Sequence, residues 1–109
     1  YIGTSTNGLS TLVRSAPAYI DDRVLAAGVA ETHTVPTGYQ VVLFSSDCNF
    51  YARPNATAAV PAADVTDGTG SEQNPAAWYL VGQVSPTVST ISLIAATSCN
   101  ISLSFYKVP

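Results

Sequence analysis

Short runs in which apolar and polar residues alternate dominate this chain, and they predict β-strands. The clearest run is 99–106, where Cys, Ile, Leu and Phe alternate with Asn, Ser, Ser and Tyr. A period of two turns one set of side chains toward a core and the other set away from it. We therefore expect Leu103 and Phe105 in the core and Tyr106 on the opposite face. No stretch repeats with the 3.6-residue period of a helix.

Further segments have the Val, Ile, Thr and aromatic content of strands: 24–35, 39–45, 48–53, 78–84 and 88–95. The segment 39–45 is apolar on both faces, which predicts a strand in the middle of a sheet and covered on both sides. Ser45, Ser46 and Asp47 predict a short turn that pairs it with 48–53 in a hairpin. Six or seven short strands indicate an all-β protein, either a small antiparallel β-sandwich or a jelly-roll-like barrel.

The N-terminal segment has apolar residues but no regular period. We expect residues 1–23 to form an extended N-terminal arm and residues 24–109 a single β-domain. A segment without a period cannot bury its own apolar side chains, so we expect it to order against a neighbouring subunit. The side chains predicted to make that contact are Leu9, Leu12, Val13, Tyr19 and Ile20.

A long connector, residues 53–77, separates the two aromatic strands and is rich in Pro, Ala, Gly, Asp and Thr. Irregular connections longer than about 12–15 residues are uncommon and are often functional. Its acids Asp64, Asp67 and Glu72 have a spacing similar to a calcium loop, but the alternating oxygen ligands of an EF-hand are missing. We expect a plain turn in which the Asp67 side chain bonds nearby backbone amides, and no metal.

The two cysteines, Cys48 and Cys99, each begin a strand-like run and lie on its apolar side. That placement favours two buried thiols, with one intrachain disulfide as the alternative.

The amino-acid composition argues against several classes of function. Charged residues make up 10% of the chain, against about 25% in ordinary soluble domains, and the net charge is −3. The scattered cations provide no basic patch for nucleic acid, and no apolar run reaches the roughly 18 residues of a membrane span. The lone His33 supports neither an enzyme nor a metal or cofactor site.

A chain this poor in charge has little to keep it apart from its neighbours, so we expect some uncharged surface to be buried against other chains. Tyr51, Tyr79 and Tyr106 fall on the faces opposite Phe50, Trp78 and Phe105 and are candidates for an aromatic contact surface. The contact residues that we predict include Tyr51, Trp78 and Tyr79. The alternative is that the domain itself covers both faces of its sheets.

The run 58–75 (AAVPAADVTDGTGSEQNP) after Phe50-Tyr51, together with ISLIA at 91–95 and Ser104-Phe105-Tyr106, resembles a family of small tailed-bacteriophage virion proteins. Several of these are similar to head decoration, or cement, proteins. The resemblance spans about residues 35–106 and includes no catalytic signature.

The resemblance implies a structural protein on the outer surface of the phage head that bridges capsid subunits. Its implied partners are the major capsid protein and copies of itself, as a homotrimer. The same features suit a tail or fibre component, or a carbohydrate-binding β-sandwich module. A carbohydrate site would use Trp78 with Asn74 and Asp67.

Overall fold

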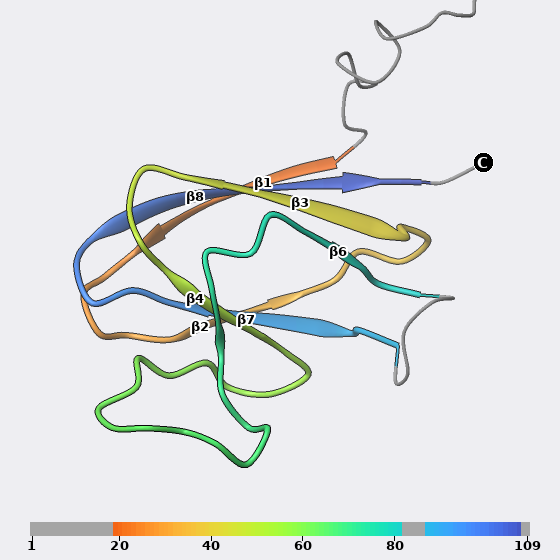
Figure 1. Ribbon diagram of the computed structural model, residues 1–109. Helices are drawn as coiled ribbons and strands as arrows, with labels where there is room; N and C mark the ends of the chain where they lie inside the picture. The colour runs from red at the N-terminus through yellow and green to blue at the C-terminus, as the bar shows by residue number, and fades with distance from the viewer. Residues whose placement is uncertain (1–18, 82–86, 108–109) are drawn as a thin grey trace, which may run out of the picture.

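Eight antiparallel strands form the folded part of the chain in the computed structural model, which describes residues 19–81 and 87–107 (Figure 1). They are β1 (Tyr19–Leu25), β2 (Glu31–Thr34), β3 (Val41–Ser46), β4 (Tyr51–Pro54), β5 (Glu72–Gln73), β6 (Ala77–Tyr79), β7 (Thr90–Ile94) and β8 (Cys99–Tyr106). The described residues form no helix long and apolar enough to cross a membrane.

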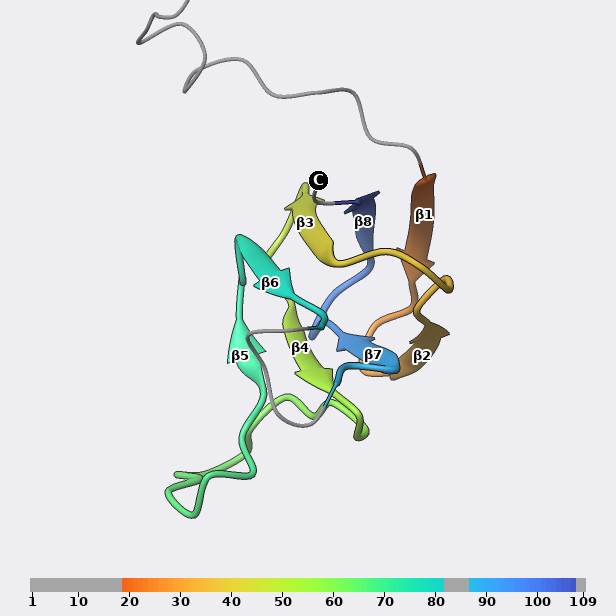
Figure 2. The same ribbon diagram turned by 90° about the vertical axis from the view of Figure 1, so that its right-hand side faces the viewer.

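The strands build two four-stranded sheets that pack face to face (Figure 2). Sheet A has the order β1-β8-β3-β6, and sheet B has the order β2-β7-β4-β5. The chain crosses to the other sheet after every strand except β4, which is followed by its neighbour β5. This is the strand order of a jelly roll, so the prediction of an all-β sandwich of this type is confirmed.

The core lies between the sheets and follows the alternation predicted for the last strand. Leu103 and Phe105 on β8 are fully buried, whereas Tyr106 is half-buried on the opposite face. From sheet B, Ile91 and Leu93 on β7 pack against them, and both are fully buried. These side chains hold the two layers together through the burial of apolar surface.

The predicted hairpin between 39–45 and 48–53 is wrong, because β3 belongs to sheet A and β4 to sheet B. Both hydrogen-bonding edges of β3 are already occupied by β8 and β6. Strand β3 does lie inside its sheet, as predicted, but only its inward residue Val42 is fully buried. Its outward residues Val41 and Leu43 remain half-buried, so the strand is not covered on both sides.

The predicted boundary at residue 23 is also wrong. Strand β1 begins at Tyr19 and pairs with β8 along its whole length, from Tyr19 opposite Phe105 to Leu25 opposite Cys99. Its inward positions include two charged residues, Asp21 and Arg23, which interrupt the apolar period and hide the strand in the sequence. The remaining residues of the expected arm, 1–18, lie outside the described residues.

The expectation of two thiols is wrong as well. Cys48 and Cys99 form a disulfide with their Cα atoms 5.7 Å apart. The crossing from β3 to β4 passes over the start of β8, where Asp47 N donates to Asn100 O at 3.2 Å. This places Cys48 beside Cys99, a proximity that a separation of 51 residues conceals in the sequence.

The predicted strand 78–84 is shorter than expected. Strand β6 ends at Tyr79, and Leu80 then bonds the neighbouring loop, its N–H donating to Gln40 O at 2.7 Å. Residues 82–84 lie outside the described residues.

Candidate interaction surface

The outer face of sheet A, the side turned away from sheet B, is the candidate interaction surface, because it carries exposed apolar side chains. Paired residues of neighbouring antiparallel strands share a face, so the register arranges the outward side chains in rows across the sheet. In order along the sheet, these rows are Tyr106–Val41–Tyr79, Ile20–Ser104–Leu43–Ala77, Asp22–Ser102–Ser45 and Val24–Asn100.

The first two rows are mainly apolar, and three of their side chains, Ile20, Ala77 and Tyr79, are exposed. Ile20 is 54% exposed and Tyr79 is 53% exposed, which is high for large apolar side chains. Beside Tyr79, the residues Val41, Ala77 and Trp78 border a hollow of about 210 Å³. An exposed apolar patch with a local depression is typical of a surface that binds a partner.

Toward its other end, the same face carries polar and acidic residues. A shallow hollow of about 500 Å³ lies there, and the charged residues that border it are the acids Asp22 and Asp47 and the cation Arg23. Asn100 donates to Asp47 through its backbone N–H at 3.0 Å and its side-chain Nδ2 at 2.8 Å. These hydrogen bonds stabilise the carboxylate and lower the pKa of Asp47. The face therefore has apolar rows at one end, the acid Asp22 in its third row, and Val24, which is 71% exposed, in its last row.

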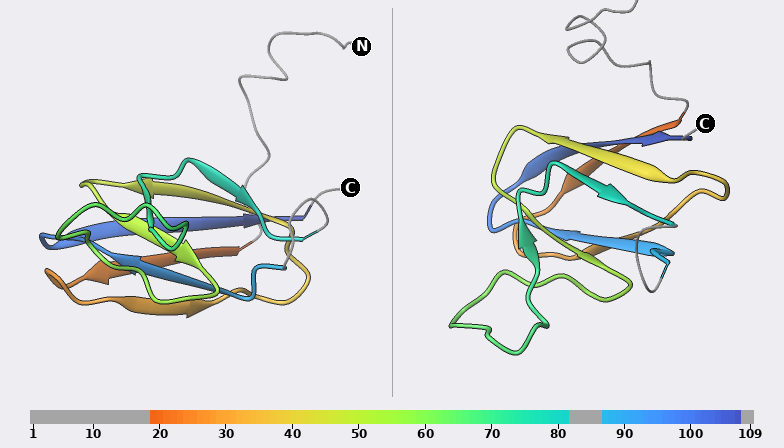
Figure 3. Two further views of the ribbon diagram at one scale, coloured as in Figure 1. Left: turned by 60° about the horizontal axis from the view of Figure 1, so that its bottom comes forward. Right: turned by 45° about the vertical axis from the view of Figure 1, so that its right-hand side comes forward.

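The outer face of sheet B differs, because the chain covers it. The connector between β4 and β5 lies on the side of sheet B away from sheet A (Figure 3). Ala58 N donates to Ser92 Oγ at 2.8 Å, and Ser92 is fully buried although it points outward on β7. Ile94, also outward, is 8% exposed. The two alternatives left open by the sequence thus apply to different sheets: the domain covers sheet B over β7, although Thr32 and Thr34 on β2 are exposed, whereas Ile20 and Tyr79 on sheet A are more than half exposed.

Asn55 fixes the start of this connector. Its φ of 58° is left-handed, a region that Asn adopts more readily than most residues. Its Oδ1 accepts hydrogen bonds from Ser89 N at 2.8 Å and Thr90 N at 3.3 Å. The connector is therefore tied to the strand that it covers.

A charged cluster joins β1 and β2, the edge strands of the two sheets. Arg23 Nη1 lies 3.7 Å from Glu31 Oε1, and Arg23 Nη2 donates to His33 Nδ1. Arginine can only donate, so Nδ1 is an acceptor and the proton of neutral His33 sits on Nε2, which is 2.5 Å from Asp21 Oδ2. Burial lowers the pKa of His33; Asp21 raises it, and the nearby Arg23 cation lowers it further.

Inward-pointing charges on an edge strand oppose the addition of another strand at that edge. The cluster therefore makes the open edge of β1 a poor docking site and leaves the outer face of sheet A as the better one.

The predicted contact residues separate into five groups. Leu9, Leu12 and Val13 lie outside the described residues. Tyr19 packs within its own domain, with its ring 5.6 Å from that of Tyr39 and 5.8 Å from that of Phe105. Ile20 and Tyr79 both lie on the outer face of sheet A, on its opposite edge strands β1 and β6. Tyr51 is on sheet B, and Trp78 points inward.

Sequence reasoning missed Val41 and Leu43 as members of this surface. The sequence 39–45 does contain apolar residues at the positions of Val41 and Leu43. Because the other face of that strand is apolar too, the sequence suggests a strand buried on both faces and not one with an exposed apolar face.

The carbohydrate cluster is not assembled. Trp78 packs against Phe44 with ring centroids 4.9 Å apart, and its Nε1 donates to Glu72 Oε1 at 2.7 Å. Asn74 accepts from Phe50 N at 3.0 Å. Asp67 belongs to a separate turn, so the three side chains have different partners and line no common pocket among the described hollows.

The turn at Asp67 confirms the prediction that the Asp67 side chain bonds a nearby backbone amide. Asp67 Oδ1 accepts from Thr69 N at 3.1 Å and from Thr69 Oγ1 at 2.6 Å, and these bonds lower the pKa of Asp67. Asp47 with the two cysteines forms a close group of metal-ligand types within the described ranges, but the disulfide removes both thiolates as ligands.

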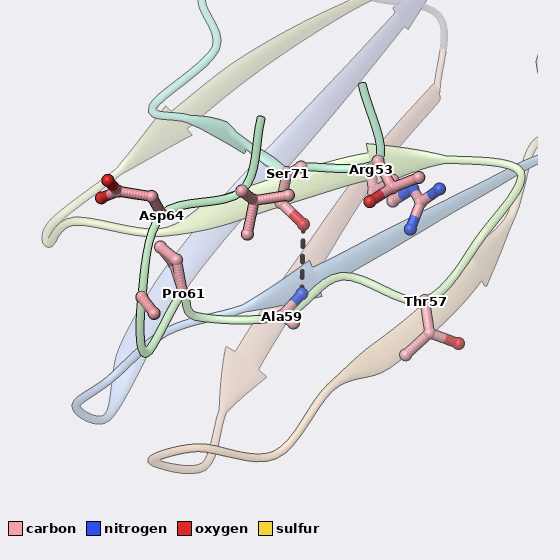
Figure 4. Close-up of a pocket in the computed structure, with 10 residues that line it drawn as sticks. Arg53, Thr57, Ala59, Pro61, Asp64 and Ser71 are labelled. Carbon is pink, nitrogen blue, oxygen red and sulfur yellow. Dashed lines mark hydrogen bonds between the residues drawn. The ribbon is translucent and has the colours of Figure 1, made fainter. Parts of the chain in front are cut away.

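The connector encloses a hollow of about 450 Å³ (Figure 4). Arg53 and Asp64 lie toward its opposite ends, and Ala59 N donates to Ser71 Oγ at 3.1 Å across it. The lining contains hydroxyl, methyl and proline groups but no histidine or cysteine. It therefore provides no nucleophile paired with a neighbouring imidazole base.

No family model, curated protein or solved structure matches this chain. The functional interpretation consequently depends on the fold, the surface and the composition.

Proposed function

We propose that this chain is a structural protein of a tailed-bacteriophage virion, acting as a head decoration or cement protein. In this role it sits on the outer surface of the head and bridges subunits of the major capsid protein, together with copies of itself as a homotrimer. It has no catalytic activity and needs no cofactor.

The observation that carries the proposal is the uncovered apolar part of the outer face of sheet A. Ile20 and Tyr79 are both more than half exposed there, and Val41, Leu43 and Tyr106 are only partly buried. In a chain with 10% charged residues, this face has little charge to oppose association. A subunit that is permanently bound to other chains can have an exposed apolar face as a free chain, because the assembly buries that face.

The jelly-roll fold is compatible with this role, since it occurs in viral capsid domains and also in lectins. A fold alone does not fix a function. The lectin alternative loses support because Trp78, Asn74 and Asp67 have separate partners. A tail or fibre component would use the same face, so location on the particle distinguishes it from a head protein.

Binding to heads that lack the protein tests the proposal. Purified chain is added to such heads, and occupancy is measured by quantitative mass spectrometry and by immunogold microscopy. We expect saturable binding over the head and raised resistance of the head to heat. Label confined to the tail, or no binding at saturating protein, would contradict the head role.

A matched pair of variants connects binding to the surface. Tyr79→Ser removes an aromatic side chain from the outer face of sheet A. Val29→Ser removes an apolar side chain of equal exposure, 53%, from the loop between β1 and β2. Burying one such side chain is worth about 1.5–3 kcal/mol, so Tyr79→Ser should weaken binding at least about tenfold. Val29→Ser should leave binding unchanged.

A further inference from the structure

We propose that the outer face of sheet A receives residues 1–18 of a second copy of this chain, so that neighbouring copies exchange their N-terminal segments. The inference rests on the subunit-contact role proposed above for this face, and it names the partner that occupies it. The interaction itself requires no capsid protein.

The position of the segment supports the exchange. Strand β1 begins at Tyr19, which pairs with Phe105, so the segment joins the domain beside the end of β8 that carries Tyr106 in the first apolar row. Eighteen residues precede this point. A fully extended segment of that length spans about 60 Å, whereas four neighbouring strands span only about 15 Å. The segment can therefore reach across the face of an adjacent copy.

The chemistry of the segment complements the face. It contains Leu9, Leu12 and Val13, and its single charged residue is the cation Arg14. The described outward positions of sheet A have apolar rows at one end, and the one charge among them is the acid Asp22, which borders a hollow together with Asp47 and Arg23. A segment with several apolar side chains and one cation thus meets a face with apolar rows and one exposed acid, Asp22.

The spacing agrees with this match. The Ile20 row and the Asp22 row are two residues apart along β1, which is about 7 Å in a strand. Leu12 and Arg14 are also two residues apart and share a side of an extended segment. With Leu12 on the Ile20 row, Arg14 falls on the Asp22 row.

This alignment favours a second copy over the segment's own domain. The segment would run in the same direction as β1. If the segment lay on its own domain, the chain would leave the Asp22 row at Arg14 and would have to turn back toward the start of β1. It would then have to turn again to enter β1 at Tyr19, so that residues 15–18 would contain two reversals of direction. Pro17 fixes its own φ and restricts Ala16 to extended backbone, which opposes two reversals there. A neighbouring copy imposes no such return.

Light scattering of the purified full-length chain between 1 and 100 µM gives the first test. We expect an oligomer whose dissociation constant rises at least about tenfold in Leu12→Asp and in Tyr79→Asp. Val29→Asp is the control and should associate as the wild type does. Circular dichroism is recorded for each variant, and only those with the wild-type β spectrum are compared. A wild-type chain that is monomeric at 100 µM overturns the inference.

Charge reversal gives a sharper test that does not depend on folding losses. Arg14→Glu and Asp22→Arg should each weaken association, and the double variant should restore at least part of it. Two single variants that weaken association without any rescue in the double variant would overturn the pairing of Arg14 with Asp22.

Paramagnetic relaxation separates exchange from binding within one chain. A nitroxide on Ser10→Cys is placed in unlabelled protein, which is mixed with ¹⁵N-labelled wild type. We expect broadening of the Ile20 and Leu43 amides in the labelled copies. Broadening only when label and isotope share one chain overturns the exchange.

The exchange and the virion role can fail separately. Association that behaves as expected without binding to heads would overturn the virion role alone, whereas head binding by a monomer would overturn the exchange alone.

Discussion

Loss of the Cys48–Cys99 disulfide should cost this domain a large part of its stability. The bond closes a loop of 51 residues, and the chain-entropy relation gives about 4 kcal/mol at 25 °C for a loop of that length. Domains of this size have total stabilities of about 5–15 kcal/mol. The variant without the bond should therefore be marginally folded.

The assay is urea unfolding followed by the fluorescence of Trp78, the single tryptophan. Three variants are compared with wild type: Cys48→Ala, Cys99→Ala and the double variant. Each single variant already removes the bond, so all three should lose a similar amount, about 4 kcal/mol. The loss in the double variant would then equal the loss in each single variant and not their sum, so the double-mutant cycle would be strongly non-additive. Two independent thiols would instead give small losses that add.

Losses below about 1 kcal/mol in each single variant, or losses that add in the double variant, would refute the reasoning. A change in the slope of unfolding free energy with urea would show that the denatured state has expanded without the bond. Chemical reduction of wild type should reproduce the double variant.

Three further predictions concern the core, the charged cluster and the connector. Phe105→Ala should lower the free energy of unfolding by about 3–5 kcal/mol because the side chain is fully buried, whereas Tyr106→Ser should cost the isolated chain much less; equal losses in urea unfolding would contradict the alternation. Because burial lowers the pKa of His33, the unfolded chain takes up a proton near pH 6.5 that the folded chain still resists. Stability should thus fall as pH drops from 7 through the folded pKa, His33→Gln should flatten this part of the profile, and an NMR titration showing a raised pKa would refute it. Asn55→Ala leaves the Ser89 amide without its acceptor and should cost about 1–3 kcal/mol, while Asn55→Asp keeps the acceptor and should cost less; equal thermal shifts would contradict this role.

The fold class could be predicted because its signal is local. The alternation around Leu103 and Phe105 specifies one buried face of β8, and the turn at Asp67 follows from the bonding habits of aspartate. The jelly-roll order could not be predicted, because it depends on which distant strands pair. Strand β3 illustrates this limit: its turn signal suggests a hairpin, yet its edges pair with β8 and β6.

The candidate surface could be predicted only in part. Ile20 and Tyr79 are two of the predicted contact residues, and both are exposed on this face, but Trp78 turns inward to Phe44, and Tyr51 lies on the other sheet. Strand β1 was missed because its inward positions hold Asp21 and Arg23, and these charges are tolerated there only because His33 and Glu31 on β2 face them. Such compensation between distant strands leaves no local trace in a sequence.

A cryo-electron microscopy reconstruction of purified phage particles that contain this protein would test the central claim most directly. The account predicts density for the jelly roll on the outer surface of the head, with the outer face of sheet A buried against other chains around Tyr79 and Leu43. Density with that face open to solvent, or located away from the head, would contradict it.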